Sequence, residues 1–267
     1  MPPRRHATRG PRHWSREAPA GPWDAIVVGG GPAGSTCAGR LKQAGMHVLV
    51  VDKQSFPRDK PCAGWITPQV VHTLKLDVAS YGHEHVIQPI TGFRTGMIGG
   101  EEVQTDYGKT VSFGIRRCEF DHYLLQRSGV SKRLGFAVKQ MDRRDGQWLI
   151  NDELTAPLLI GAGGFFCPVA RMLGARQGRE ESVVVAQEVE FAATPEQREA
   201  IHVDVHRPEL YFCDDLEGYG WCFRKGDYVN IGLGRLDNQK LSSHVKAFCD
   251  FLHERGRVTC DIPEKFV

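Results

Sequence analysis

The sequence lacks any apolar run long enough to span a bilayer, so it predicts no transmembrane helix. It has eight cysteines but no C-x-x-C pair, which argues against a zinc site and against a disulfide framework. Single, scattered cysteines are typical of reduced thiols, so we expect a cytoplasmic protein without metal. The net charge is only +2, which gives no reason to expect a nucleic acid as partner.

The first 22 residues also lack something, namely the apolar core of a secretory signal. They are rich in Pro, Arg, His and Gly, and this composition predicts a disordered basic tail. A transit peptide and a start site placed too early are the alternatives. With 41% hydrophobic and 25% charged residues overall, the remainder is ordinary for a globular protein, and folding is expected to begin near Trp23.

What is present begins with a glycine turn. Residues 26–28 are Ile-Val-Val, a short apolar run typical of a buried parallel strand. Gly29-x-Gly31-x-x-Gly34 follows, with Pro32 where a helix would start. In such a turn the glycines allow close backbone packing, and the N–H groups at the helix start bind a pyrophosphate. The pattern predicts a dinucleotide site; a turn that binds no phosphate is the alternative.

A second strand completes this unit. The helix is expected to end at Gly45, and the apolar strand 47–52 ends in Asp52, 18 residues after Gly34. An acidic side chain at this point accepts hydrogen bonds from an adenosine ribose. FAD and NAD are both bound in this way, so the unit alone leaves the choice of cofactor open.

The rest of the chain alternates between two kinds of pattern. The first part predicts a polar loop at 53–64, a helix at 67–75, two or three strands within 79–110, a helix from 117 closed by Gly129, strands at 136–141, 147–150 and 154–160, and a short helix at 168–174. From residue 182 hydrophobic residues alternate at 183–191, 201–205 and 229–233, which predicts an antiparallel sheet with one covered face. An amphipathic helix is expected at 241–255.

These elements predict an α/β fold in which a Rossmann-like nucleotide-binding domain is interleaved with a β-rich, antiparallel-sheet substrate domain. The nucleotide-binding domain is expected at 23–78 and 113–178. The β-rich domain, with the C-terminal helix, is expected at 79–112 and 179–267. A cofactor and a substrate would meet in the crevice between the two.

Several motifs occur together in an order that resembles the geranylgeranyl reductase family, within the para-hydroxybenzoate-hydroxylase-like FAD monooxygenases. They are the glycine turn, residues 56–64 (Phe-Pro-Arg-Asp-Lys-Pro-Cys-Ala-Gly), Arg117-x-x-Phe-Asp121, Gly161-Ala-Gly-Gly164 with Pro168-Val-Ala-Arg171, and Tyr219-Gly-Trp-Cys-Phe-Arg224. The resemblance covers about Trp23 to Arg235. It implies FAD as cofactor, with NAD(P)H as a candidate electron donor.

The resemblance also implies roles for single residues. Its cofactor-binding residues would be Gly29, Gly31, Pro32, Ala33, Gly34, Asp52, Lys53, Cys62, Arg117 and Gly163. Arg117 would lie against the ribityl–phosphate portion and Cys62 near the flavin ring. A surface arginine and a buried structural thiol are the respective alternatives.

An aromatic stripe supplies the expected substrate pocket. Tyr219, Trp221 and Phe223 alternate and therefore share one face of a strand, which in this family covers an apolar substrate. Ordinary core packing is the alternative. The chain departs from the family pattern at Gly163, where an acid is usual, and at Arg224, where a proline is usual.

The expected function is that of an FAD-dependent oxidoreductase acting on an apolar small molecule, by reduction of double bonds or by hydroxylation. The sequence identifies no general acid or base. A catalytically silent nucleotide-binding protein is the main alternative, and an NAD-dependent dehydrogenase and a halogenase are less favoured. Proteins of the resembled family have a G-D-A-x-G segment beside the flavin, and none follows Gly234 here. A non-functional fragment that lacks this part of the FAD site is therefore a further alternative. Peripheral membrane contact and the oligomeric state stay open.

Overall fold

The computed structural model describes residues 22–175, 181–236 and 240–267. The expected basic tail, apart from Pro22, lies outside the described residues. Among the described helices, none has the length and apolar character needed to cross a bilayer.

A four-stranded parallel sheet forms the base of the first part of the molecule, which contains the glycine turn. Its order is β12 (Leu158–Gly161), β1 (Ala25–Val28), β2 (Val48–Asp52) and β8 (Ser131–Leu134). The neighbouring strands all run parallel. β1 is buried along its whole length, which explains why its sequence is uniformly apolar rather than alternating.

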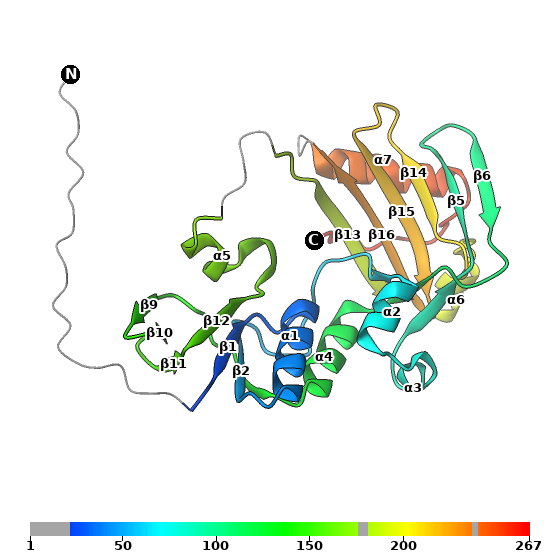
Figure 1. Cartoon of the computed structure of the whole chain (residues 1–267). Coiled ribbons are helices and arrows are strands. Elements are labelled where there is room, and N and C mark those ends of the chain that lie inside the picture. The colour runs from blue at the N-terminus through cyan, green and yellow to red at the C-terminus, as the bar shows by residue number, and fades with distance from the viewer. Residues whose placement is uncertain (1–21, 176–180, 237–239) are drawn as a thin grey trace, which may run out of the picture.

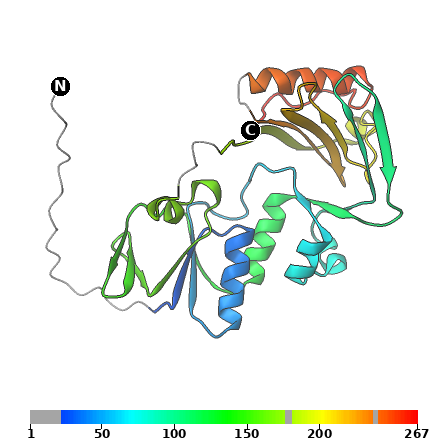
Figure 2. The ribbon, with the colours of Figure 1, turned by 45° about the horizontal axis from the view of Figure 1, so that its top comes forward.

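Each face of this sheet is covered by different elements. α1 (Pro32–Gln43) and α4 (Arg117–Arg127) lie side by side on one face, where Ala38 and Leu125 pack against Val27 and Val50. The other face is covered by α5 (Pro168–Met172) and a small antiparallel sheet, as Figure 2 shows. That sheet consists of β11 (Leu154–Ala156), β10 (Gln147–Ile150) and β9 (Met141–Arg144).

A six-stranded sheet forms the second part of the molecule (Figure 1). Its order is β13 (Val185–Ala192), β16 (Tyr228–Arg235), β15 (Gly218–Lys225), β14 (Glu209–Phe212), β5 (Gly92–Met97) and β6 (Glu102–Asp106). Only the β14–β5 pair is parallel. α7 (Leu241–Glu254) covers one face, burying Phe248 and Leu252 against Ile231 and Leu233.

A third, smaller sheet joins the two parts. It consists of β3 (Trp65–Ile66), β7 (Ser112–Ile115) and β4 (Ile87–Ile90), and it packs with α2 (Pro68–Leu74) and α3 (Val78–Gly82). The remaining short helices are η1 (Gly164–Phe166) and α6 (Pro195–Glu199). The loop 53–64 leads from β2 of the parallel sheet into β3 of this joining sheet.

The fold class is confirmed, and three local expectations are wrong. The strand expected at 136–141 is found at 141–144, because the Asn151 side chain accepts hydrogen bonds from the N–H groups of Lys139 and Gln140. The single strand expected at 154–160 is two strands in different sheets. Residues 201–205 form no strand; Ile201 makes one isolated bridge, to Val258.

Candidate functional site

The glycine turn joins β1 to α1. Glycine is present at its three positions for different physical reasons. Gly29 has φ +115°, and a Cβ there would lie 2.4 Å from the carbonyl oxygen of Ala162. A Cβ at Gly34 would lie 1.8 Å from the carbonyl oxygen of Gly29. At both positions, glycine therefore allows two backbone segments to pack in direct contact. Gly31 is the N-cap of α1 and has φ −71°, which any residue adopts, so its missing side chain leaves open space at the helix start.

Pro32, Ala33 and Gly163, which the sequence predicts to bind the cofactor, lie in or beside the glycine turn. Pro32 occupies the first turn of α1, and Ala33 beside it is exposed. N–H groups at the start of a helix have no partner within the helix, so they are available to a phosphate. Gly163, from the segment after β12, is exposed and is the N-cap of η1.

Asp52 lies at the end of β2 and braces the turn. One carboxylate oxygen accepts a hydrogen bond from the N–H of Gly30 at 2.7 Å, and the other accepts from the N–H of Gln54 at 2.8 Å. A carboxylate has about four lone-pair sites, so two acceptor positions remain for a ribose. Lys53, the next residue, is exposed.

Arg58 and the carboxylate of Asp121 lie at the open side of Gly31, and Arg117 binds the same carboxylate. The buried carboxylate of Asp121 accepts two hydrogen bonds from Arg117, at 2.8 and 3.0 Å, and lies 3.1 Å from Nη2 of Arg58. The Arg58 guanidinium also lies 4.7 Å from the centroid of the Phe56 ring. Two guanidinium groups share one carboxylate, so the cluster has a net positive charge that favours an anion.

Arg58 was missed by the sequence analysis. Its Nη2 would be 3.4 Å from a Cβ on Gly31, and its Nη1 is buried without a hydrogen-bond partner. The available signal in the sequence was a basic residue in the loop that follows Asp52. The charge of Arg117 is secure: burial disfavours it, but hydrogen bonds and the charge of Asp121 raise its pKa.

Cys62 and Arg117 lie where two cavities meet. One, of about 350 Å³, runs along α2 and is lined mainly by apolar side chains, including Trp65, Ile66 and Phe120. The other, of about 230 Å³, is polar and reaches the sheet at Glu188. Cys62 is half-buried between them. The structure therefore brings the expected thiol and arginine together, and Pro32 at the helix start lines the apolar cavity beside them.

The aromatic residues of β15 lie on the face of the six-stranded sheet opposite α7. Phe223 is 1% exposed and packs near Trp65, with ring centroids 5.9 Å apart. Trp221 is 7% exposed and donates a hydrogen bond from its indole to Asn230 at 2.7 Å. Tyr219 is 43% exposed. The three share one face as expected, but only Tyr219 presents substantial surface.

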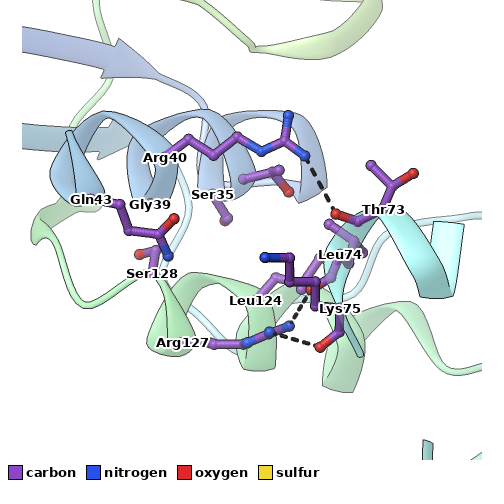
Figure 3. Close-up of a pocket in the computed structure, with 11 residues that line it drawn as sticks. Ser35, Gly39, Arg40, Gln43, Thr73, Leu74, Lys75, Leu124, Arg127 and Ser128 are labelled. Atoms are coloured by element: carbon purple, nitrogen blue, oxygen red, sulfur yellow. Dashed lines mark hydrogen bonds between the residues drawn. The ribbon is translucent and has the colours of Figure 1, made fainter. Parts of the chain in front are cut away.

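A third cavity, of about 320 Å³, lies between α1, α4 and the end of α2 (Figure 3). Arg127 donates to the carbonyl oxygens of Leu74 and Lys75 at 2.8 and 2.9 Å, and Arg40 donates to that of Thr73 at 3.4 Å. These bonds satisfy carbonyl groups at the C-terminal end of α2. The two arginines therefore have a structural role: they attach the C-terminal end of α2 to α1 and α4.

The fold and the turn together define a Rossmann-type dinucleotide-binding domain joined to an antiparallel β-sheet domain. Residues 27–83 match the model of the NAD(P)-binding Rossmann-like domain. The crystal structure of a geranylgeranyl bacteriochlorophyll reductase-like protein from Thermoplasma acidophilum has the same fold, with a TM-score of 0.69 and 20% identity over 85% of this chain and 61% of its own. The halogenase PltM, solved with phloroglucinol and FAD, gives a TM-score of 0.72 and 15% identity over 92% of this chain and 59% of its own.

Two curated relatives are similar to most of this chain. The menaquinone reductase of Mycobacterium tuberculosis (strain ATCC 25618 / H37Rv) is 32% identical over 81% of this chain. The geranylgeranyl diphosphate reductase of Rhodobacter capsulatus is 28% identical over 79% of it. Both relatives are reductases, and their similarity supports the resemblance of the chain to the geranylgeranyl reductase family. The chain spans 56% and 54% of the length of these two relatives, respectively.

Proposed function

We propose that the chain binds FAD and is an oxidoreductase that acts on an apolar, lipid-like small molecule. The observation that carries this proposal is the position of Cys62 and Arg117. They lie at the junction of an apolar cavity and a polar one, and the open start of α1 borders the same apolar cavity. A flavin bound at the turn would have its phosphates and its ring next to different walls of one site.

The residues present fit the phosphate portion of FAD. The open side of Gly31 is a cradle that a side chain would fill, and the unpartnered Nη1 of Arg58 is a buried donor that an anion would satisfy. Asp52 retains acceptor capacity for the adenosine ribose. Arg117, held by Asp121, would donate to the ribityl–phosphate portion.

The bound flavin would supply hydride or oxygen-activating chemistry, which the protein directs by binding and orientation. The apolar cavity along α2 would exclude water and hold a hydrocarbon chain. Reduction of double bonds and hydroxylation both fit such a site, with NAD(P)H as the candidate electron donor. The names of the two curated relatives, a menaquinone reductase and a geranylgeranyl diphosphate reductase, support an isoprenoid-type substrate and reduction.

The wider organisation is also proposed. We infer that 23–78 with 113–178 forms the FAD domain and that 79–112 with 179–267 forms the substrate domain, with β7 crossing the boundary at 112. Tyr219 is the member of the aromatic stripe with the best access to a substrate. All eight cysteines are free thiols, which supports a cytoplasmic location.

FAD titration tests the proposed function. The purified chain should take up FAD, turn yellow and bleach with dithionite. Asp52→Ala should weaken FAD binding roughly ten- to a hundredfold, because a hydrogen bond to a charged group contributes about 1.5–3 kcal/mol. Competition by AMP should weaken in parallel. Glu254→Ala, which removes an exposed acid on α7, is the matched control. A chain that binds neither FAD nor AMP would refute the proposal.

A further inference from the structure

The short turn 61–64 connects the cofactor site to the six-stranded sheet. Gly64 has φ +71°, and a Cβ there would lie 2.0 Å from the carbonyl oxygen of Ile115 and 2.8 Å from Nζ of Lys225. The N–H of Ile115 donates to the carbonyl oxygen of Gly64 at 2.7 Å. The turn therefore lies in contact with the backbone of β7, in the small sheet that joins the two parts, and Gly64 has no space for a side chain.

A buried lysine holds the middle of the turn. Lys225, on β15, is 0% exposed. Its ammonium donates to the carbonyl oxygens of Ala63 and Ile115, at 3.0 and 3.1 Å, and forms an ion pair with Glu190. An ammonium without partners would be very unfavourable at this depth, but all three of its N–H groups have an acceptor here. The position of the Ala63 carbonyl is therefore coupled to a charge fixed on the sheet.

A buried carboxylate holds Cys62 itself. Glu188, on β13, is 6% exposed and accepts a hydrogen bond from the backbone N–H of Cys62. Its own N–H and carbonyl pair with Val267 at 3.0 and 2.9 Å, so its main chain is fixed. The Cys62 sulfur in turn accepts from the N–H of Gly64 at 3.5 Å. The thiol thus occupies a place set by contacts from the opposite part of the molecule.

We propose that Glu188 and Lys225 are positioning residues that fix the Cys62 turn across the crevice and so place the thiol at the junction of the two cavities. The relevance of this placement to the cofactor rests on the proposed function. Neither residue is taken to react. Each acts through the backbone of the turn, and together they couple the substrate-domain sheet to the wall of the flavin site.

Site-specific alkylation of the full chain tests the proposal. Cys62 would be modified with iodoacetamide and quantified by peptide mass spectrometry, with Cys37 of α1 as internal reference. Glu188→Ala should raise the alkylation rate of Cys62 roughly two- to tenfold, as expected for loss of one hydrogen bond that closes a local structure. Glu188→Gln keeps an acceptor oxygen and should stay near the wild-type rate. A change caused only by the lost charge would appear in both variants.

Lys225→Met provides a second, independent variant, because it keeps most of the buried stem and removes the ammonium. It should also raise the Cys62 rate while Cys37 is unaffected. Melting temperatures of all variants, measured alongside, identify any variant whose thiols react because the whole chain unfolds. Wild-type rates at Cys62 in folded Glu188→Ala and Lys225→Met would overturn the proposal.

A parallel arm separates the positioning role from the proposed function. Added FAD should protect Cys62 of the wild type from alkylation if the cofactor lies beside it. Protection in the wild type that is weakened in Glu188→Ala supports both conclusions. Faster alkylation in Glu188→Ala with no protection by FAD in any variant would keep the positioning role and refute the placement of the flavin.

Discussion

At the scale of single residues, the charge of the site depends on one buried carboxylate that pairs with two arginines. Asp121 has no exposed surface and holds both Arg117 and Arg58. A carboxylate paired with one arginine would leave the site close to neutral, whereas two arginines leave a positive charge facing the start of α1. The sequence motif identified Arg117 and Asp121 but not the second arginine, because Arg58 reaches Asp121 only after the loop folds back.

The first prediction concerns Gly31. Because its backbone is in an ordinary conformation and a Cβ meets nothing closer than 3.4 Å, Gly31→Val should fold. Its methyl groups would fill the space toward Arg58 that a pyrophosphate needs, so FAD binding should become undetectable by calorimetric titration. Gly34→Ala should instead lower the melting temperature, since its Cβ would collide with the Gly29 carbonyl. Parent-like FAD affinity in Gly31→Val would place the cofactor elsewhere.

The second prediction concerns Arg58. Arg58→Gln removes a charge near the phosphate position, and affinity for FAD and for ADP should both fall roughly tenfold or more. Binding of the adenosine end through Asp52 is not touched, so AMP and ADP should become harder to distinguish. Arg143→Gln, on the exposed side of β9, is the charge-matched control. If ADP affinity is equal in both variants, Arg58 contributes nothing to phosphate binding.

At the scale of elements, one pattern gave two outcomes. Alternating hydrophobic residues correctly predicted β13, where Val189 is buried. The same alternation at Ile201 and Val203 buries both side chains in the core beneath α7, yet without a strand ladder. The Asp204 side chain accepts from the N–H of His206 at 2.7 Å and turns the chain. Alternation therefore predicted the burial of Val189, Ile201 and Val203, whereas strand pairing depends on partners that the sequence does not show.

The third prediction tests how α7 docks on the sheet. A Cβ on Gly220 of β15 would lie 2.7 Å from three ring atoms of Phe248. Phe248 is fully buried, so its ring has little freedom to move. Gly220→Ala should therefore destabilise the chain by about 1–3 kcal/mol, visible as a lower melting temperature. Gly39→Ala in α1, whose Cβ meets only ordinary contacts, should be neutral or stabilising. If Gly220→Ala has the melting temperature of the wild type, the contact between Gly220 and Phe248 does not determine how α7 packs on the sheet.

At the scale of the whole molecule, contacts between residues close in the sequence could be predicted, whereas contacts between distant residues could not. The glycine turn and Asp52 lie within one βαβ unit, where spacing alone identifies them. Glu188 is 126 residues from Cys62, and Lys225 is 162 residues from Ala63. No local pattern marks a glutamate or lysine on a strand as the partner of a distant turn. These contacts appear only when the two parts of the molecule are assembled.

The last prediction uses the buried carboxylate between those two parts. Burial raises the pKa of Glu188 above its ordinary value of 4.5, and the Cys62 N–H and Lys225 only partly oppose this. The other charged groups around the same cavity are Asp59, Lys60, Arg117, Glu190 and Lys265. A carboxyl whose pKa is raised on folding stabilises the protein below its unfolded pKa. That stability is lost as pH rises through the folded pKa, because the buried group must then ionise.

Glu188→Gln cannot ionise, so it should not share this loss. The melting temperature of Glu188→Gln minus that of the wild type should therefore increase between about pH 4 and about pH 8, and taking the difference cancels the titration of the surrounding groups. Differential scanning fluorimetry of both proteins across this range measures it. A difference that instead falls with rising pH would mean that the Cys62 N–H and Lys225 hold Glu188 ionised. The ionised carboxylate would then stabilise the crevice at neutral pH, because its pairing with the Cys62 N–H and Lys225 would outweigh the cost of burial.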